Sequence, residues 1–158
     1  MNFETVFDVA QAGYKDWWVP AIGLIFVAIG AALAFFPRWA SLVISAPPWA
    51  GWPIIVFALI WMLGAFTLSY FPYIWARDAL LSGDHSVVEG PVTDFVPLPR
   101  EGKGKESFTV AGQKFEYSPY GGTPGFNNAS SHGGPLNTGI YVRVTYTGNT
   151  ILRLEIAR

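Results

Sequence analysis

The sequence contains no cysteine, and between residues 17 and 76 it has almost no charge. Without cysteine, the chain has no disulfide, no thiolate metal ligand and no cysteine nucleophile. The formal net charge of -1 lacks the basic excess that general nucleic-acid binding requires, so no nucleic-acid partner is expected. From Trp17 to Ala76 the only charged residue is Arg38. A chain that confines its charges in this way has one part suited to lipid and another suited to water.

The uncharged stretch contains two apolar runs, over about residues 17–36 and 54–75. A helix rises about 1.5 Å per residue, so about 20 residues cross a hydrocarbon core of about 30 Å. Pro72 is expected to kink or end the second helix, and residues 77–82 can continue it as far as Gly83. We therefore predict a two-helix transmembrane hairpin within residues 17–82.

Residues 38–52 form a short apolar connection between the two spans. Pro47, Pro48 and Gly51, with Pro53 just after, are expected to break any helix there. Tryptophan is typical of the membrane–water interface, so this loop is expected to lie along the interface. The tryptophans that suggest this are Trp39, Trp49 and Trp52.

Neither span contains an ionisable residue, which makes a pump or transporter less favoured. Both spans instead carry small residues spaced so that helices can approach closely. Two interpretations are open: the spans pack on each other, or they contact other subunits. The residues concerned are Ala28 with Ala32, Gly30 with Ala34, and Ala58 with Ala65 near Gly64.

Residues 1–16 are predicted to form an amphipathic helix, because apolar side chains recur on one face at helical spacing. This helix is expected either to lie in the membrane interface or to pack on the soluble domain or a partner. Its other face is largely acidic, which disfavours attraction to anionic lipid. The apolar positions are Phe3, Phe7, Ala10, Tyr14 and Trp17.

After Gly83 the pattern changes from helical to alternating, which is typical of strands. An open sheet would leave two unpaired edges, and closure into a barrel removes them. The fold class expected is therefore a membrane α+β protein in which residues 83–158 form a small five-stranded all-β barrel, OB-like or SH3-like. The predicted strands are residues 86–96, 106–110, 113–117, 140–146 and 151–156.

Residues 118–139 form an unusually long connection between the third and fourth predicted strands. The segment has no charged residue but contains Tyr120, Phe126 and Leu136. A disordered linker usually has charge and few aromatics, so we expect an ordered loop that packs down on the domain or on a partner. The alternative is a mobile loop.

Three groups of side chains are candidate chemical sites. Asp84, His85 and His132 are residue types that bind metal, but no motif spacing links them. Ser130, Ser131 and His132 are adjacent in sequence, which does not establish the convergence that a catalytic triad needs. The carboxylates are expected on a solvated outer face rather than in a catalytic pair. These are Glu89, Asp94, Glu106, Glu116 and Glu155.

Residues 100–105 are a basic loop without the strand–loop–helix context of a P-loop. The loop is interpreted as a solvated turn, with contact to phosphate or lipid headgroups as the alternative.

No catalytic residue, cofactor or metal is predicted for the chain.

The soluble half resembles a known protein family. The runs VVEGPVTDFVP, ESFTV, FEYS, GFNN, HGGP and ILRLEI are similar to those of a bacterial family without an assigned function, whose members have a small β-domain. The resemblance covers the last half of the chain only. It implies an OB-like β-domain and supplies no substrate, cofactor or catalytic residue.

Charge near the spans predicts the orientation. Lys15 and Arg77 flank the hairpin on the side of both termini, and three further basic residues follow in residues 100–105, whereas the connecting loop has only Arg38. The positive-inside rule then places both termini and the β-domain in the cytoplasm, with the spans in a bacterial inner membrane.

These features favour a non-enzymatic accessory or scaffold subunit of a larger membrane complex, such as a respiratory or photosynthetic assembly. The expected partners are the lipid bilayer and other membrane subunits. One alternative is a homo-oligomeric pore or ring, and another is a membrane-bound enzyme or metal-binding protein that uses His85 and His132. The candidate interaction residues are Tyr120, Phe126, His132, Leu136, Trp39, Trp49, Trp52, Gly30 and Ala34.

Overall fold

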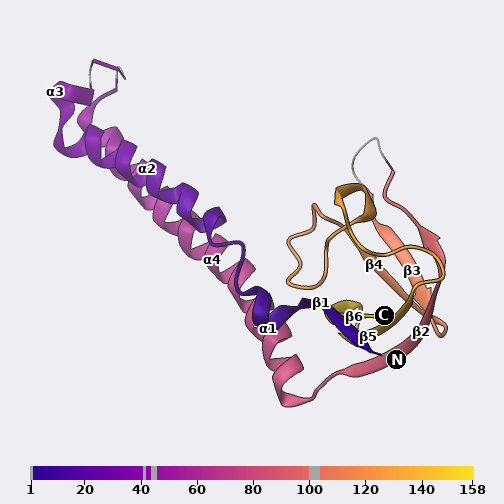
Figure 1. The fold of residues 1–158 in the computed structure, drawn as a ribbon. Coiled ribbons are helices and arrows are strands. Elements are labelled where there is room, and N and C mark those ends of the chain that lie inside the picture. Colours follow the sequence, from indigo (N-terminus) through magenta and orange to yellow (C-terminus); the bar gives the residue numbers. More distant parts are fainter. Residues whose placement is uncertain (1, 41, 44–45, 100–103) are drawn as a thin grey trace. The chain divides into compact units, whose positions relative to one another are not determined.

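The computed structural model describes residues 2–40, 42–43, 46–99 and 104–158. The chain divides into two compact units. The hairpin unit is Lys15–Phe71, and the β-domain unit combines Met1–Tyr14 with Pro72–Arg158. The division falls inside helix α4, whose last turns belong to the β-domain unit (Figure 1).

The hairpin unit contains two long helices, α2 (Trp18–Phe35) and the first part of α4 (Gly51–Ser82). Both are long and apolar enough to cross a membrane. The connection carries a short helix α3 (Pro37–Ala40) and a 3-10 turn η1 (Pro48–Ala50).

The second helix is longer than predicted at its N-terminal end. Pro53 was expected to break helical structure, but it lies in the first turn, where its missing N–H has no intrahelical partner to lose. Pro72 lies inside the helix and does not end it. The continuation to Ser82 is confirmed, and Gly83 ends the helix with a φ of 83°.

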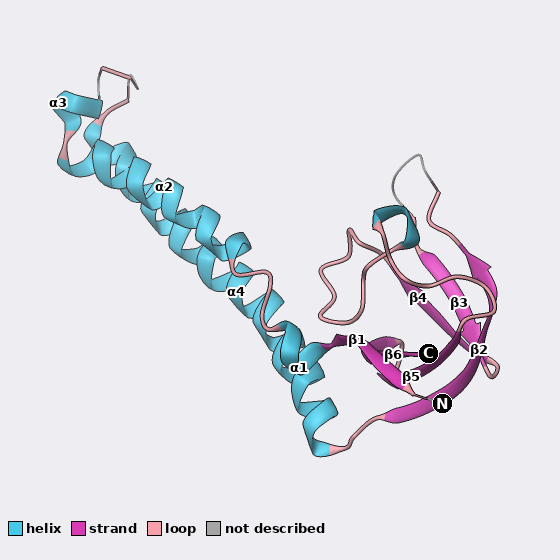
Figure 2. Ribbon diagram, viewed as in Figure 1, coloured by secondary structure: helices cyan, strands magenta, loops and turns pink. Residues whose placement is uncertain are grey.

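The β-domain is a six-stranded antiparallel sheet with the order β1-β6-β5-β2-β3-β4. The sheet is open, with β1 and β4 at its edges, so the predicted five-stranded barrel is wrong. The sixth strand comes from the N-terminus, which lies beside the C-terminal strand (Figures 1 and 2). The strands are β1 (Phe3–Asp8), β2 (Ser86–Val96), β3 (Glu106–Val110), β4 (Gln113–Tyr117), β5 (Tyr141–Thr147) and β6 (Thr150–Ala157).

The predicted amphipathic helix over residues 1–16 is also wrong. Phe3–Asp8 is a strand paired with β6, and only α1 (Val9–Ala12) is helical. The spacing of four between Phe3 and Phe7 fits a helical period and a strand period equally, and pairing with β6 decides between them. Of the two placements left open for this segment, the structure has the packing on the soluble domain.

Asp8, at the end of β1, contacts both α1 and β6. Its carboxylate accepts a 2.8 Å hydrogen bond from the N–H of Ala10, which caps α1. The same buried carboxylate lies 2.7 Å from the guanidinium of Arg153 on β6. The N-terminal strand and the short helix are therefore fixed to the last strand of the chain.

Apolar side chains of the β-domain unit form two clusters. The main cluster fills the inner face of the sheet, and the second lies between β6, α1 and the last turns of α4. A register shift in the β5–β6 pairing sets Ile151 opposite Tyr146, so that Ile151 enters the main cluster and Leu152 enters the second. The second cluster comprises Val9, Ala76, Ala79, Leu80 and Leu152.

Candidate interaction surface

The loop over residues 118–139 is anchored by one buried carboxylate, that of Glu106 at the start of β3. Its oxygens accept hydrogen bonds from the N–H of Ser130 (3.0 Å) and from the Ser130 hydroxyl (2.6 Å). They also accept from the N–H of Leu98 (3.3 Å) and from the Tyr117 hydroxyl. The prediction that Glu106 lies on a solvated outer face is therefore wrong.

Burial also defines the chemistry of Tyr117. Burial away from water raises the pKa of the Tyr117 phenol far above its usual value, and the hydrogen bond to Glu106 raises it further. The phenol therefore stays protonated at physiological pH and donates a hydrogen bond to a carboxyl oxygen of Glu106. Glu106, Tyr117 and Ser130 form a fixed hydrogen-bonded latch that holds the loop on the sheet.

The loop packs on its own domain. Phe126, Ala129 and Leu136 are buried in the main cluster. A Cβ on Gly134 would lie 2.6 Å from the carbonyl carbon of Ala129, so the backbone crosses itself too closely for any side chain. The expectation of an ordered, packed loop is confirmed. Phe126 and Leu136 are core residues, so their proposed role in contacting a partner is wrong.

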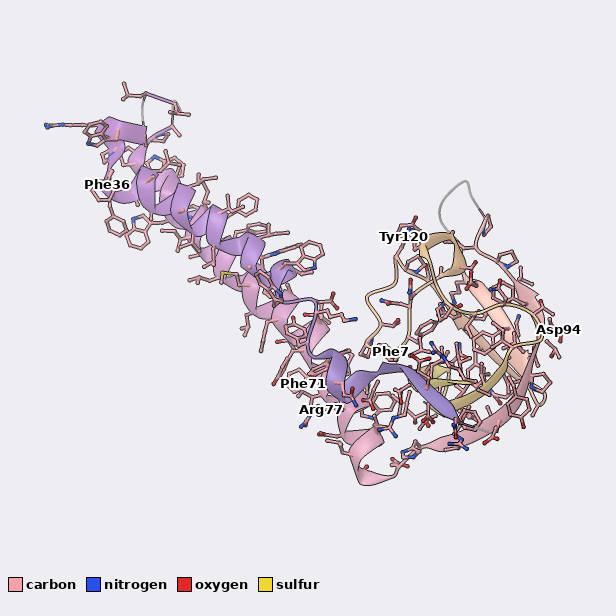
Figure 3. The ribbon with its side chains drawn as sticks, in the orientation of Figure 1. Phe7, Phe36, Phe71, Arg77, Asp94 and Tyr120 are labelled. Carbon is pink, nitrogen blue, oxygen red and sulfur yellow. The ribbon has the colours of Figure 1, made fainter. Side chains whose placement is uncertain are left out.

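Tyr120 (Figure 3) is exposed on this loop, and so is His132. Tyr120 is 63% exposed, and its ring meets the imidazole edge-on with centroids 5.9 Å apart. The Ser131 hydroxyl lies 3.1 Å from Nδ1 of His132. No acidic side chain is among the contacts described for His132, so the arrangement resembles an exposed aromatic patch more than a catalytic triad.

The residues considered for metal binding are not brought together. Nδ1 of His85 lies 3.1 Å from the carbonyl oxygen of Ala79, at the end of α4. His132 lies on the loop, and Asp84 is exposed. Within the described residues, no three side chains of histidine, aspartate or glutamate come close enough to hold a metal ion.

Three of the other carboxylates lie in ion pairs on the outside of the sheet. Arg143 reaches both Glu89 (2.9 Å) and Glu155 (3.8 Å), and the ring of Phe3 lies 4.0 Å from its guanidinium carbon. Glu116 pairs with Lys114 at 3.0 Å, and hydrogen bonding to that ammonium lowers the pKa of Glu116. The solvated outer face is confirmed for Glu89 and Glu116, whereas the Glu155 side chain is only 17% exposed.

The fourth carboxylate, Asp94, is exposed on β2. It has a φ of 47°, at the register shift in the β2–β3 pairing. Most of the predicted basic loop, residues 100–103, lies outside the described residues.

In the hairpin unit, Gly30, Ala34 and Gly51 face the other helix, whereas Ala28 is exposed. A Cβ on Gly30 would lie 2.7 Å from Cγ1 of Ile55, and a Cβ on Gly51 would lie 2.7 Å from the backbone nitrogen of Ala34. Gly30 and Ala34 thus serve packing within the hairpin, which is the first of the two interpretations left open by the sequence. A Cβ on Gly64 would meet no heavy atom of the described residues within 4 Å, so its side of α4 is open.

The three tryptophans of the connection are exposed. Trp39 lies on α3 and Trp49 on η1, and both project from the tip of the hairpin. Trp52 lies in the first turn of α4, and its ring meets that of Phe35 edge-on with centroids 5.5 Å apart.

Comparison of the chain with protein-family models, with curated proteins and with solved structures gave no match. The resemblance noted in the sequence therefore adds no functional assignment. Function is inferred from the geometry of the two units.

Proposed function

We propose that this chain is a non-enzymatic accessory or scaffold subunit of a larger complex in a bacterial inner membrane. Its two apolar helices span the bilayer, and its β-domain docks on other subunits from the cytoplasm. Tyr120 and His132 form the exposed part of the docking surface, and the Glu106 latch keeps that surface in one conformation.

One observation carries this proposal: the long helices present their large apolar side chains outward. Leu24, Leu63 and Leu68 are 57%, 70% and 78% exposed. A helix in the core of a soluble protein is mostly covered, and apolar patches of this extent are rare on proteins in water. Hydrocarbon is the solvent in which such a surface is stable.

The pairing of β1 with β6 supports two spans with both ends on one side. Phe3–Asp8 precedes the hairpin, and Thr150–Ala157 follows it, yet the two are neighbours in one sheet. Both ends of the hairpin therefore belong in one compartment. If α2 were a signal sequence and were cleaved off, β1 and Asp8, the partner of Arg153, would be lost with it. This supports α2 as a membrane helix that stays in the protein.

Charge supports the cytoplasmic assignment. Lys15 precedes the first apolar helix and Arg77 follows the apolar part of the second. Arg38 is the one charge in the connection between the two helices. An excess of basic residues marks the cytoplasmic side.

Two experiments test the proposal in native membranes. Extraction with alkaline carbonate should leave the full chain in the membrane pellet, because α2 and α4 are integral. The tagged chain, purified in gentle detergent, should then bring down the other subunits in a fixed stoichiometry. The double variant Tyr120→Ala/His132→Ala should lose them while remaining in the pellet, because neither side chain is part of the core.

Asn149→Ala, in the exposed turn between β5 and β6, is the matched surface control and should co-purify like the natural chain. Recovery of the chain alone as a discrete multimer or a monomer would overturn the accessory-subunit proposal. Release of the chain by carbonate would overturn its membrane insertion.

A further inference from the structure

The tip of the hairpin combines exposure with an apolar composition. Residues 36–50 contain one charge, Arg38, and no carboxylate. Leu42 and Val43 are 77% and 86% exposed. The described residues of the tip therefore form an apolar surface that no other part of the described chain covers. Phe36 (Figure 3), Trp39 and Trp49 add three exposed aromatic rings.

The length of α2 places this tip at a defined depth. Its 18 residues span about 27 Å, slightly less than a hydrocarbon core of about 30 Å. The chain that follows Phe35 therefore begins at the edge of the hydrocarbon and not in bulk water. Tryptophan is enriched at that level, where its apolar ring and its N–H are both accommodated.

We propose that the hairpin tip inserts into the phospholipid interface of the leaflet opposite the β-domain. Phe36, Trp39, Leu42, Val43 and Trp49 would contact the boundary between headgroups and acyl chains. The occupant is lipid because the tip continues the lipid-facing apolar surface of the two helices and because its tryptophans match the interface. This inference depends on the membrane insertion proposed above.

The absence of cysteine allows a direct test with single labels. Val43→Cys, Leu63→Cys and Asn149→Cys, each labelled with an environment-sensitive fluorophore, report on the tip, the middle of α4 and the β5–β6 turn. The full chain is placed in nanodiscs at one copy per disc, so that no other protein can cover the tip. Quenching is measured with nitroxide lipids labelled near the headgroup or near the end of the acyl chain, and with aqueous iodide.

The label at Val43→Cys should be quenched more strongly by the shallow nitroxide than by the deep one. Its iodide quenching should be several-fold weaker than at Asn149→Cys, because interfacial apolar groups lie about 5–10 Å into the headgroup and acyl boundary. The label at Leu63→Cys should show the reverse nitroxide order. Leu42→Cys repeats the tip measurement at a neighbouring exposed position.

The controls separate two failures. Iodide quenching at Val43→Cys equal to that at Asn149→Cys, with deep quenching retained at Leu63→Cys, would place the tip in water and overturn this inference alone. Iodide access at Leu63→Cys as well would overturn both the inference and the membrane insertion on which it depends.

Discussion

The β-domain unit buries its large apolar side chains, whereas the hairpin unit exposes many of its own. In the β-domain, large apolar side chains such as Phe108, Phe115 and Leu154 point inward and are fully buried. In the hairpin, large apolar side chains such as Leu68 point outward. The membrane insertion proposed above accounts for this contrast, because each unit would then expose the surface that its surroundings accept.

The contacts that hold each unit together differ for the same reason. The β-domain is filled by aromatic rings in tilted and edge-on pairs, such as Phe108 with Phe115 at 5.2 Å. The hairpin brings backbones together at Gly30 and Gly51, where a Cβ has no room. In the lipid surroundings proposed above, pairing apolar faces brings no hydrophobic gain, and close backbone approach provides the contact instead.

The largest contrast is expected from one substitution made in both units. Leu154→Ala should destabilise the β-domain by about 2–5 kcal/mol, because it leaves a cavity in the main cluster. Leu68→Ala should leave the hairpin almost unchanged, because acyl chains fill the space. Amide hydrogen exchange of the full chain in nanodiscs measures the first effect, and the distance between spin labels on α2 and α4 measures the second.

An equal response to the two substitutions would contradict the comparison. A large loss from Leu68→Ala would indicate that this side chain packs on protein. That result would favour the oligomeric pore or ring over a hairpin surrounded by lipid.

The second contrast concerns two glutamates of neighbouring strands. Glu106→Ala should cost about 2–4 kcal/mol, because buried donors on Tyr117 and Leu98 and a part-buried donor on Ser130 lose their acceptor. Glu116→Ala removes a surface carboxylate from a solvated ion pair and should leave stability unchanged. Hydrogen exchange should also reveal faster exchange at the Ser130 amide in Glu106→Ala. Slow exchange there would contradict the role of Glu106 as the anchor of the loop.

The third contrast compares two glycines of α4. Gly51→Ala should destabilise the hairpin by about 1–3 kcal/mol and move the helices apart, because its Cβ would lie 2.7 Å from the Ala34 nitrogen. Gly64→Ala meets open space and should leave the helix separation unchanged. Spin-label distances between α2 and α4 check both variants, and an unchanged distance in Gly51→Ala would argue against close backbone packing.

Local patterns predicted most of the regular structure. The limits of β2, β3 and β4 agree with the sequence, and those of β5 and β6 differ by one residue. β3 and β4 alternate along most of their length, and glycines lie in the turns at Gly112 and Gly148, so the information lies within a few residues. The two apolar helices follow equally from composition and length.

Non-local partners account for what the sequence missed. β1 is a strand because it pairs with β6, and the ion pair between Asp8 and Arg153 joins residues 145 positions apart. Without β1 only five strands were expected, and closure into a barrel was the expected way to remove exposed edges. In the structure the edge strand β4 carries charged Lys114 and Glu116, which discourage edge-to-edge pairing.

The candidate site was predicted only in part. Glu106 had a usable signal, since its position in ESFTV places it on the same face as Phe108 and Val110. Its partner Ser130 lies 24 residues away in an irregular loop, where no periodicity applies. Phe126 and Leu136 correctly indicated that the loop is ordered. The sequence could not show whether they pack in the core or contact a partner, because both locations favour large apolar residues.

The smallest expected effect concerns the turn between β3 and β4, where the β-domain has strain that the hairpin helices lack. Ala111 and Gly112 have φ values of 47° and 85°, the left-handed pair that a two-residue hairpin turn requires. Alanine is disfavoured there by contact between its Cβ and the backbone, whereas asparagine adopts this conformation readily. Ala111→Asn should therefore stabilise the β-domain by about 0.5–1 kcal/mol, measured as slower exchange of the β3 and β4 amides. Ala111→Val, which is β-branched, should have the opposite effect, and equal stability of the two variants would mean that the turn does not adopt this conformation.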